Sequence, residues 1–331
     1  MSNIEKLKGK LYKRHIFMTG GTGFFGKSFI EFFIRNEFEI NLTILTRNPD
    51  KFVKSNPELA KDILLIKGNI LEPPKKHGVG YDYVIHAAAP VTGAEGKDNA
   101  LTIFDDIVTG MRNVLEFSNI NSVKKLLNIS SGAVYGKQTF NLPAFKEDYL
   151  GSPDTSNPLS AYGEGKRVAE LLCSINSASH KLEYSNARCF SFVGKYLPLD
   201  SHFAIGNFIR NGLRNEDIII KGDGTAIRTY MFTDDLILWL LTVMVYGKNA
   251  ESYNIGSDVC YSIKDVANHV AKLFPNSRVV IEKKLEGGLS SSRYIPSINK
   301  IKDEFELEVE FDLDVSILKT VNYLKNHNMS I

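Results

Sequence analysis

The stretch His15-Ile16-Phe17-Met18-Thr19-Gly20-Gly21-Thr22-Gly23-Phe24-Phe25-Gly26 joins a short apolar run to a glycine-rich loop. The loop matches the pattern G-x-G-x-x-G over residues 21–26, and a helical pattern follows over residues 28–35. Between a strand and a helix, such glycines let the backbone approach a pyrophosphate, whose charge the helix N-terminus stabilises. The stretch therefore predicts the start of a dinucleotide-binding unit, and the alternative is a tight turn without a ligand.

Apolar runs and helical patterns continue to alternate beyond this loop. We expect strands at residues 16–18, 42–45, 63–66, 83–85, 124–129 and 182–190, and helices at residues 28–35, at 100–117 and after Asn157-Pro158. Repeated strand–helix units with apolar strands indicate a parallel sheet covered on both faces. The predicted fold class is α/β, a Rossmann-type doubly wound parallel sheet with a smaller, interleaved C-terminal substrate lobe.

The regular alternation ends near residue 191, where glycines and Pro198 break the chain into shorter elements. We assign residues 1–190 to the dinucleotide-binding domain and residues 191–331 mostly to a substrate-binding lobe. Residues 230–257 are expected to return to the first domain, because residues 253–256 resemble a strand that can join its sheet. Ser262 and Asp265 have the spacing of a helix capping box.

Composition excludes several classes of protein. The chain has 331 residues, of which 43% are hydrophobic and 24% charged, and its net charge of +2 offers no broad basic field for nucleic acid. No run approaches the roughly 20 apolar residues of a membrane span, and the basic start over residues 6–14 is interpreted as a tail before the first strand. Cys173, Cys189 and Cys260 form no C-x-x-C pair, so we expect no metal site and a reducing, cytoplasmic setting.

The cofactor preference rests on the end of the second strand. A carboxylate there would hold the ribose 2′-hydroxyl of NAD, but the chain has Thr46-Arg47-Asn48. The Arg47 guanidinium can pair with the 2′-phosphate of NADP through a planar fork, so NADP(H) is favoured and NAD(H) remains open. The alternative is that Arg47 only solvates the loop.

Three side chains suggest proton transfer beside a hydride-transferring cofactor. Tyr162 and Lys166 are four residues apart on one face of a predicted helix, and Ser131 ends the preceding strand. Tyrosine has an ordinary pKa near 10, which a neighbouring ammonium lowers. Since ligands bind at the carboxyl edge of such sheets, Ser131 is placed to join this pair.

Further motifs lie in a fixed order along the chain. They are Thr19-Gly20-x-x-Gly23-x-x-Gly26, His86-Ala87-Ala88-Ala89, Ser131 with Tyr135-Gly136, Tyr162-x-x-x-Lys166, Gly222-Asp223-Gly224, Arg228-Thr229-Tyr230, Thr233-Asp234-Asp235-Leu236 and Tyr253-Asn254-Ile255-Gly256. As a set they resemble the extended short-chain dehydrogenase/reductases, specifically the NAD(P)-dependent nucleotide-sugar epimerase/dehydratase group.

The resemblance implies a role for each matching residue. Tyr162 would be the acid/base, Lys166 would bind the nicotinamide ribose and lower the tyrosine pKa, and Ser131 would bond the reacting sugar oxygen. The implied cofactor contacts are Gly20, Gly23, Phe24, Phe25, Gly26, Arg47, Asn69, Ile70, Ala87, Ala88, Ala89, Tyr162 and Lys166. The implied substrate contacts are Ser131, Ser191, Asn207, Phe208, Arg228 and Arg293, with the two arginines on the diphosphate. The alternatives are surface or interlobe ion pairs for the arginines and core packing for Phe208.

Three motifs depart from the family pattern. The family's Gly-Asp after the third strand is Gly68-Asn69 here, and its usual Asn in the strand after the catalytic helix is Ser191. Dehydratases place an Asp-Glu pair after the hydroxyl residue and uronate decarboxylases a Glu at the second of those positions, where this chain has Gly132-Ala133. Without those carboxyl groups, elimination lacks its acid and base, so both reactions rank low.

The sequence thus predicts an NAD(P)-dependent oxidoreductase acting at carbon 4 of a nucleotide-diphosphate sugar. We favour reduction of a 4-keto-6-deoxy sugar nucleotide, and the alternative is a 4-epimerase with tightly bound NAD. A non-catalytic dinucleotide-sensing protein ranks below both. The resemblance also implies a homodimer, paired through the helices near residues 100–117 and 158–175.

Overall fold

A computed structural model describes residues 1–72, 80–89, 99–201, 203–283 and 292–327. The chain divides into two compact units. The first unit comprises Met1–Gly136, Gly151–Cys189 and Ile237–Tyr253, and the second comprises Lys137–Leu150, Phe190–Leu236 and Asn254–Ile331.

The first unit is built on a seven-stranded sheet. Its strands, in spatial order, are β11 (Glu251–Ile255), β6 (Glu183–Cys189), β5 (Lys125–Ser131), β4 (Tyr83–His86), β1 (His15–Thr19), β2 (Asn41–Thr46) and β3 (Ile63–Lys67). Neighbouring strands from β6 to β3 pair in parallel. The order reverses between β1 and β4, as in doubly wound folds, so the predicted Rossmann-type α/β fold is confirmed.

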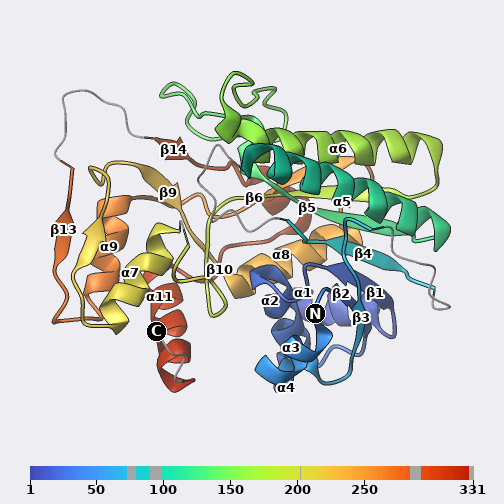
Figure 1. Cartoon of the computed structure of the whole chain (residues 1–331), viewed down its shortest axis with the longest axis horizontal. Coiled ribbons are helices and arrows are strands. Elements are labelled where there is room, and N and C mark those ends of the chain that lie inside the picture. Colours follow the sequence, from blue (N-terminus) through green and yellow to red (C-terminus); the bar gives the residue numbers. More distant parts are fainter. Residues whose placement is uncertain (73–79, 90–98, 202, 284–291, 328–331) are drawn as a thin grey trace. The chain divides into compact units, whose positions relative to one another are not determined.

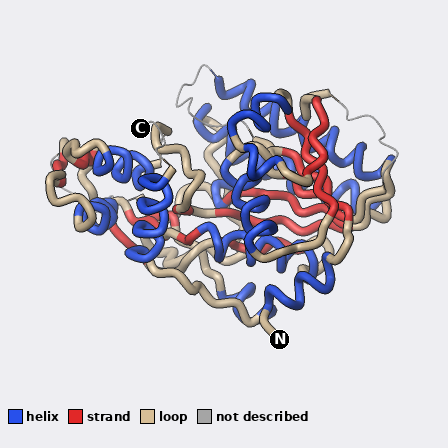
Figure 2. Tube along the Cα trace, turned by 90° about the horizontal axis from the view of Figure 1, so that it is seen from below, coloured by secondary structure: helices blue, strands red, loops and turns tan. Residues whose placement is uncertain are grey.

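Helices cover both faces of this sheet (Figure 2). The long helices α5 (Ala100–Ile120) and α6 (Ala161–Ser179) lie side by side on one face, and α2 (Phe24–Arg35) lies on the other (Figure 1). Every residue of β5 is buried, because both of its faces are covered. One core cluster joins α5 and α6 to the strands through Val114, Phe117, Leu126, Cys173 and Tyr184.

The N-terminal segment is a helix, so the interpretation of it as a basic tail is wrong. Helix α1 spans Asn3–Leu11, and the Ser2 side chain caps it by accepting a bond from the Glu5 N–H at 3.3 Å. Leu7 and Leu11, four residues apart, are buried on one side of the helix. Two apolar positions among the lysines are therefore enough to fix a helical turn against the unit.

Short connecting elements complete the first unit. They are α3 (Pro49–Ser55), α4 (Pro57–Ala60), and the 3₁₀ turns η2 (Gly132–Tyr135) and η3 (Pro158–Ser160). The chain passes between the units within α8 (Thr233–Tyr246) and again within β11. Among the described residues, no helix has the length and apolar character needed to cross a membrane.

The second unit consists of small sheets and helices. Its strands are β7 (Phe192–Val193), β8 (Ile218–Ile220), β9 (Ile227–Thr229), β10 (Met231–Phe232), β12 (Cys260–Ser262), β13 (Val279–Ile281) and β14 (Arg293–Tyr294), and its helices are α7 (Ala204–Leu213), α9 (Ile263–Ala271), α10 (Asn299–Phe305) and α11 (Leu313–Asn326). Sheets form between β7 and β10, between β8 and β13, and across β12, β9 and β14. The predicted capping box at Ser262 and Asp265 is confirmed at the start of α9.

Candidate active site

The first unit brings Ser131, Tyr162 and Lys166 together. Ser131 is the last residue of β5, and Tyr162 and Lys166 lie one turn apart at the start of α6. The Asn157 side chain accepts a bond from the Leu159 N–H at 3.1 Å and so caps η3, which leads into α6 at Ala161. The expected cap therefore heads a short 3₁₀ turn instead of the catalytic helix itself.

Hydrogen bonds orient the three side chains. The Ser131 hydroxyl oxygen accepts the Ala133 N–H at 3.1 Å, and a hydrogen bond joins Ser131 to the Tyr162 phenol. Lys166 Nζ donates to the Ile129 carbonyl at 2.8 Å and lies 6.0 Å from the centroid of the Tyr162 ring. With its oxygen already bonded to Ala133, the Ser131 hydroxyl can direct its proton to Tyr162.

Burial dominates the electrostatics of this cluster. It raises the pKa of Tyr162 above its ordinary value of 10.0, the hydrogen bond from Ser131 lowers that pKa, and the neighbouring Cys189 thiol raises it. Burial also lowers the pKa of Lys166 to about 8, against opposing contributions from Cys189 and Glu170. Ser131 thus supplies the interaction that lowers the tyrosine pKa here, and the expected effect of Lys166 stays a prediction.

The glycine loop has the shape that a dinucleotide pyrophosphate requires. Gly20 has a φ of +72°, and a Cβ there would lie 2.5 Å from the Ala87 carbonyl carbon. A Cβ at Gly26 would lie 2.2 Å from the Gly21 Cα, so tight packing excludes side chains at both positions. At Gly23 the nearest atom would be the Gly20 oxygen at 3.5 Å, an ordinary contact, and Gly23 caps α2 without a side-chain bond. The backbone N–H groups of this first turn therefore fit an approaching anion.

The end of β4 is fixed against this loop by a buried polar contact. Thr19 Oγ1 and His86 Nδ1 lie 2.8 Å apart, and the Ala88 N–H donates to Thr19 Oγ1 at 3.3 Å. Burial lowers the pKa of His86 to about 3, so the imidazole is neutral. Ala87, Ala88 and Ala89 follow β4 directly, and the first two lie beside Gly20.

The other predicted cofactor residues lie at strand or helix ends of the first unit. Arg47 is exposed after β2, and Phe24 and Phe25 begin α2 with ring centroids 5.4 Å apart. Asn69 Oδ1 accepts the Leu71 N–H at 3.2 Å, and its amide N–H groups form no hydrogen bond with the described residues. The Ile70 carbonyl accepts Asn113 Nδ2 at 2.8 Å, which ties this turn to α5.

The second unit brings Arg228 and Arg293 onto neighbouring strands. In the parallel pair of β9 and β14, Arg293 lies opposite Ile227 and Arg228 lies opposite Tyr294. Arg228 Nη1 donates to the carbonyls of Ile227 and Ser292 at 2.8 and 2.9 Å, and burial lowers its pKa. In the described parts of the chain, neither guanidinium has a carboxylate partner, and Arg293 Nε is buried without a hydrogen-bond partner. Because successive strand residues point to opposite faces of a sheet, this register places Arg228 and Arg293 on opposite faces.

Three further predicted substrate residues have structural contacts of their own. The Ser191 carbonyl accepts the Met231 N–H at 3.1 Å. Asn207 Nδ2 donates to the Ser201 carbonyl at 2.8 Å, and Phe208 is only 2% exposed within α7. These contacts hold the second unit together whether or not a ligand is bound.

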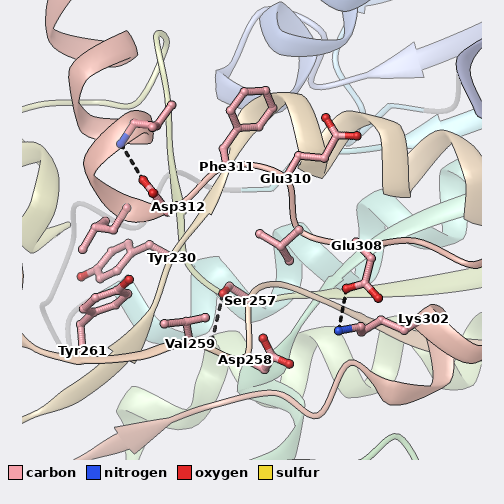
Figure 3. A pocket seen from close by; sticks show the side chains of 13 residues that line it. Tyr230, Ser257, Asp258, Val259, Tyr261, Lys302, Glu308, Glu310, Phe311 and Asp312 are labelled. Carbon is pink, nitrogen blue, oxygen red and sulfur yellow. Dashed lines mark hydrogen bonds and ion pairs between the residues drawn. The ribbon is translucent and has the colours of Figure 1, made fainter.

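A separate pocket of the second unit contains none of the predicted site residues (Figure 3). Tyr230 and Tyr261 line it beside the acidic side chains of Asp258, Glu308 and Glu310, and Lys302 pairs with Glu308 at 2.7 Å. The pocket therefore has no direct connection to the predicted chemistry.

Sequence reasoning missed the charged pair next to the catalytic residues. Glu170 on α6 and Arg188 on β6 form an ion pair at 2.7 Å, mostly shielded from solvent. The available signal is spacing, since Glu170 follows Lys166 by four residues and therefore lies on the same face of the helix.

Comparisons with known proteins identify the family. A sequence model described as "NAD dependent epimerase/dehydratase family" matches residues 16–256. The chain belongs to this family. The recognition based on the ordered motifs is confirmed.

Family relatives match over most of the chain at low identity. A UDP-N-acetyl-alpha-D-glucosaminuronate decarboxylase from Bacillus cytotoxicus is 26% identical, covering 95% of this chain and 98% of the relative. UDP-glucuronic acid decarboxylase 6 from Arabidopsis thaliana is 29% identical, covering 78% of this chain and 74% of the relative.

Solved structures of the family share the fold. A UDP-glucose 4-epimerase from Thermotoga maritima, solved with UDP-glucose, has a TM-score of 0.80 at 22% identity and covers 95% of this chain and 99% of its own. A UDP-glucuronic acid 4-epimerase from Bacillus cereus, in complex with UDP-glucuronic acid and NAD, has a TM-score of 0.77 at 23% identity, with coverage of 95% and 99%.

Proposed function

We propose that this protein epimerises carbon 4 of a nucleotide-diphosphate sugar, using an NAD that stays bound through the reaction. The placement of Ser131 at the end of β5, beside Tyr162 and Lys166 one turn apart at the start of α6, is the observation that carries the proposal. It places an acid/base phenol at the carboxyl edge of a parallel sheet, where ligands bind in such folds. The uncapped glycine turn of the same unit fits the cofactor.

The chain's own residues account for the proton transfers. Tyr162 accepts the proton of the sugar's 4-hydroxyl group and later returns it, while Ser131 holds the same oxygen and orients the phenol. Lys166 holds the ribose of the cofactor through its ammonium. The glycine loop and the first turn of α2 bind the pyrophosphate, with Asn69 on the adenine side. When bound, the cofactor supplies reversible hydride transfer.

Residues near Ser131 argue against decarboxylation and dehydration, although two relatives are named decarboxylases and the family description includes dehydratases. The turn after Ser131 contains Gly132 and Ala133, which have no carboxyl group. On α6, Glu170 is paired with Arg188, and Glu164 lies 3.5 Å from Arg167. Neither this turn nor this helix therefore supplies an unpaired carboxylate that could add a proton to a sugar carbon or remove one from it.

The reductase favoured from the sequence becomes the second candidate. It rests on Arg47, which is exposed and has no ion-pair partner within the described residues, so its guanidinium can meet a 2′-phosphate. The first candidate is supported by neighbouring structures that are 4-epimerases, one of them solved with NAD. We therefore favour NAD over NADP.

The substrate contacts proposed for the second unit rest on its arginines. Arg228 would bind the diphosphate by charge-assisted hydrogen bonds, which are stronger than neutral ones. The register places Arg293 on the other face of the sheet, so its contact with the diphosphate stays a prediction. Ser191, Asn207 and Phe208 remain predictions for the remainder of the substrate.

We also propose a homodimer paired through α5 and α6. Leu171 and Ile175, one turn apart on α6, are 57% and 55% exposed, and Leu101 on α5 is 73% exposed. Burying such side chains against a second copy would be favourable. Light scattering at micromolar protein concentration should give the mass of a dimer, and a monomer mass with full activity would contradict the proposal.

The test of function is a substrate panel with analysis of the cofactor. Purified protein is denatured and the released nucleotide identified, and intact protein is assayed with UDP-glucose, UDP-glucuronic acid and 4-keto sugar nucleotides. We expect released NAD(H) and carbon 4 epimers formed without added cofactor. Cofactor-free protein that consumes NADPH with a 4-keto sugar would establish the reductase instead.

A further inference from the structure

We propose that Glu170 and Arg188, together with Ser130 and Tyr135, form a positioning network that sets the distance between Ser131 and Tyr162. None of these four residues is placed to touch substrate or cofactor by the motifs above. The inference rests on the proposed function, because it assigns the network to the catalytic end of the same unit.

Glu170 is the centre of the network. Its carboxylate accepts the Ser130 hydroxyl at 2.6 Å, and three Arg188 bonds from Nε and Nη2 at 2.7–3.2 Å. The two side chains are 12% and 15% exposed, so water competes little for these bonds. Glu170 is two turns after Tyr162 on α6, and Ser130 is the neighbour of Ser131 on β5. The carboxylate thus joins the helix that carries one catalytic residue to the strand that carries another.

Arg188 extends the network to the turn after Ser131. Its Nη1 donates to the Tyr135 hydroxyl at 2.9 Å, and its guanidinium lies 4.8 Å from the centroid of the Tyr135 ring. Burial lowers the pKa of Arg188, but the Glu170 carboxylate outweighs it, and the net shift is upward. Arg188 is therefore a permanent cation that holds Tyr135, the last residue of η2, against β6.

The position of η2 is transmitted to Tyr162 by close packing. A Cβ at Gly163 would lie 2.8 Å from the Ala133 carbonyl oxygen, so η2 and the first turn of α6 are in direct contact next to Tyr162. Ser131 caps η2 through the Ala133 N–H at 3.1 Å. A displacement of either α6 or η2 would therefore change the hydrogen bond between Ser131 and Tyr162.

A stability role is the alternative explanation for the pair. Replacing a buried ion pair by apolar residues of similar volume is often neutral or stabilising, whereas removing one partner leaves an uncompensated charge. The two explanations predict different behaviour for single and double replacements.

The experiment compares three variants with the wild type. They are the single variants Glu170→Gln and Arg188→Lys, and a double variant in which Glu170→Met and Arg188→Met are combined. Glu164→Gln serves as the control, because it removes a carboxylate from a more exposed ion pair on the same helix. Each protein is assayed with the panel sugar that the wild type converts fastest, and its melting temperature is recorded.

We expect kcat to fall roughly 10- to 100-fold in Glu170→Gln, since misplacement by about 1 Å costs on that order, while KM stays near the wild-type value. The double variant should melt near the wild-type temperature and keep the kcat defect. The control should match the wild type. Recovery of kcat in the double variant, or unchanged kcat in Glu170→Gln, would overturn the proposal.

A second readout does not depend on turnover. The ionisation of Tyr162 is measured by phenolate absorbance as pH is raised, in the presence of NAD. For each protein, the absorbance of the same protein carrying Tyr162→Phe is subtracted, which leaves the signal of Tyr162. Glu170→Gln should raise the pKa of Tyr162, because the hydrogen bond from Ser131 that lowers it is weakened. If the wild type converts no nucleotide sugar, the proposed function fails, and this titration still decides the positioning role, which an unchanged pKa would refute.

Discussion

The catalytic end of the first unit and the arginine-bearing strands of the second unit differ in how their charged side chains are paired. Around α6, Glu170 and Arg188 are paired, and Lys166 donates to a carbonyl. On β9 and β14, Arg228 and Arg293 have carbonyl and hydroxyl partners but no carboxylate within the described residues. The charges of Glu170 and Arg188 in the first region are paired with each other, whereas the two arginines of the second have no carboxylate partner in the part of the chain that the structure describes. We therefore expect the first to determine kcat and the second to determine KM.

Tyr162→Phe should have the largest effect. It removes the proton-transferring hydroxyl and leaves the ring, so kcat should fall roughly 10²- to 10⁴-fold, the usual contribution of a general acid/base. Steady-state kinetics and NAD binding measured together provide the check. Wild-type turnover by this variant would show that the proton passes elsewhere.

Arg228→Met should act on binding. Charge-assisted hydrogen bonds contribute about 1.5–3 kcal/mol, so KM for the nucleotide sugar should rise roughly 10- to 100-fold while kcat changes little. Arg228→Lys keeps the positive charge but loses the planar pair of N–H donors, so its KM should lie between those of the wild type and Arg228→Met. If kcat falls and KM does not, the assignment of binding to the second unit is wrong.

Asp235, a carboxyl group of the second unit, provides a pH-dependent contrast with Glu170. Burial raises the pKa of Asp235 to about 7, although the N–H groups of Phe311 and Glu310, at 3.2 and 3.1 Å, favour its charged form. The folded protein therefore holds a proton that the unfolded chain releases above its ordinary pKa of 3.8. The free energy of unfolding should fall as pH rises from about 4 through about 7.

Asp235→Asn should remove this slope. At pH near 8 the variant should be more stable than the wild type, by up to about 4 kcal/mol, and at pH near 5 the difference should shrink. Urea unfolding at the two pH values is the measurement. A variant less stable than the wild type at both values would show that the carboxylate, not the acid, is the form the fold needs.

Arg47→Ala should have the smallest effect on the proposed reaction. The wild type should bind NAD more tightly than NADP, and the variant should lose affinity for NADP while keeping that for NAD. Fluorescence titration with both dinucleotides measures this. Tighter binding of NADP by the wild type, lost in Arg47→Ala, would favour the reductase.

The sequence predicted the sheet because its signals are local. Each signal is carried by residues close together in the sequence. Examples are the glycine loop, the apolar run of β5 and the spacing of Tyr162 and Lys166, and the structure contains the elements that they predict. Helix α1 was missed because only Leu7 and Leu11 mark its buried side.

Contacts between distant residues could not be predicted in the same way. Ser130, Glu170 and Arg188 meet only after β5, α6 and β6 have packed, and no local pattern in the sequence encodes that meeting. Likewise, the surroundings of Arg228, which include no carboxylate partner among the described residues, form only when β9 and β14 pair. The residue types suggested chemistry, and the tertiary packing decided which charges are paired.

The central claim is tested most directly by the fate of the hydrogen at carbon 4. UDP-glucose carrying deuterium at carbon 4 is incubated with the purified protein, without added cofactor, and the product is analysed by mass spectrometry and NMR. The proposed function predicts the carbon 4 epimer with its deuterium retained at that carbon. Loss of the deuterium to solvent during epimerisation, or turnover of nucleotide sugars that requires added NADPH, would contradict it.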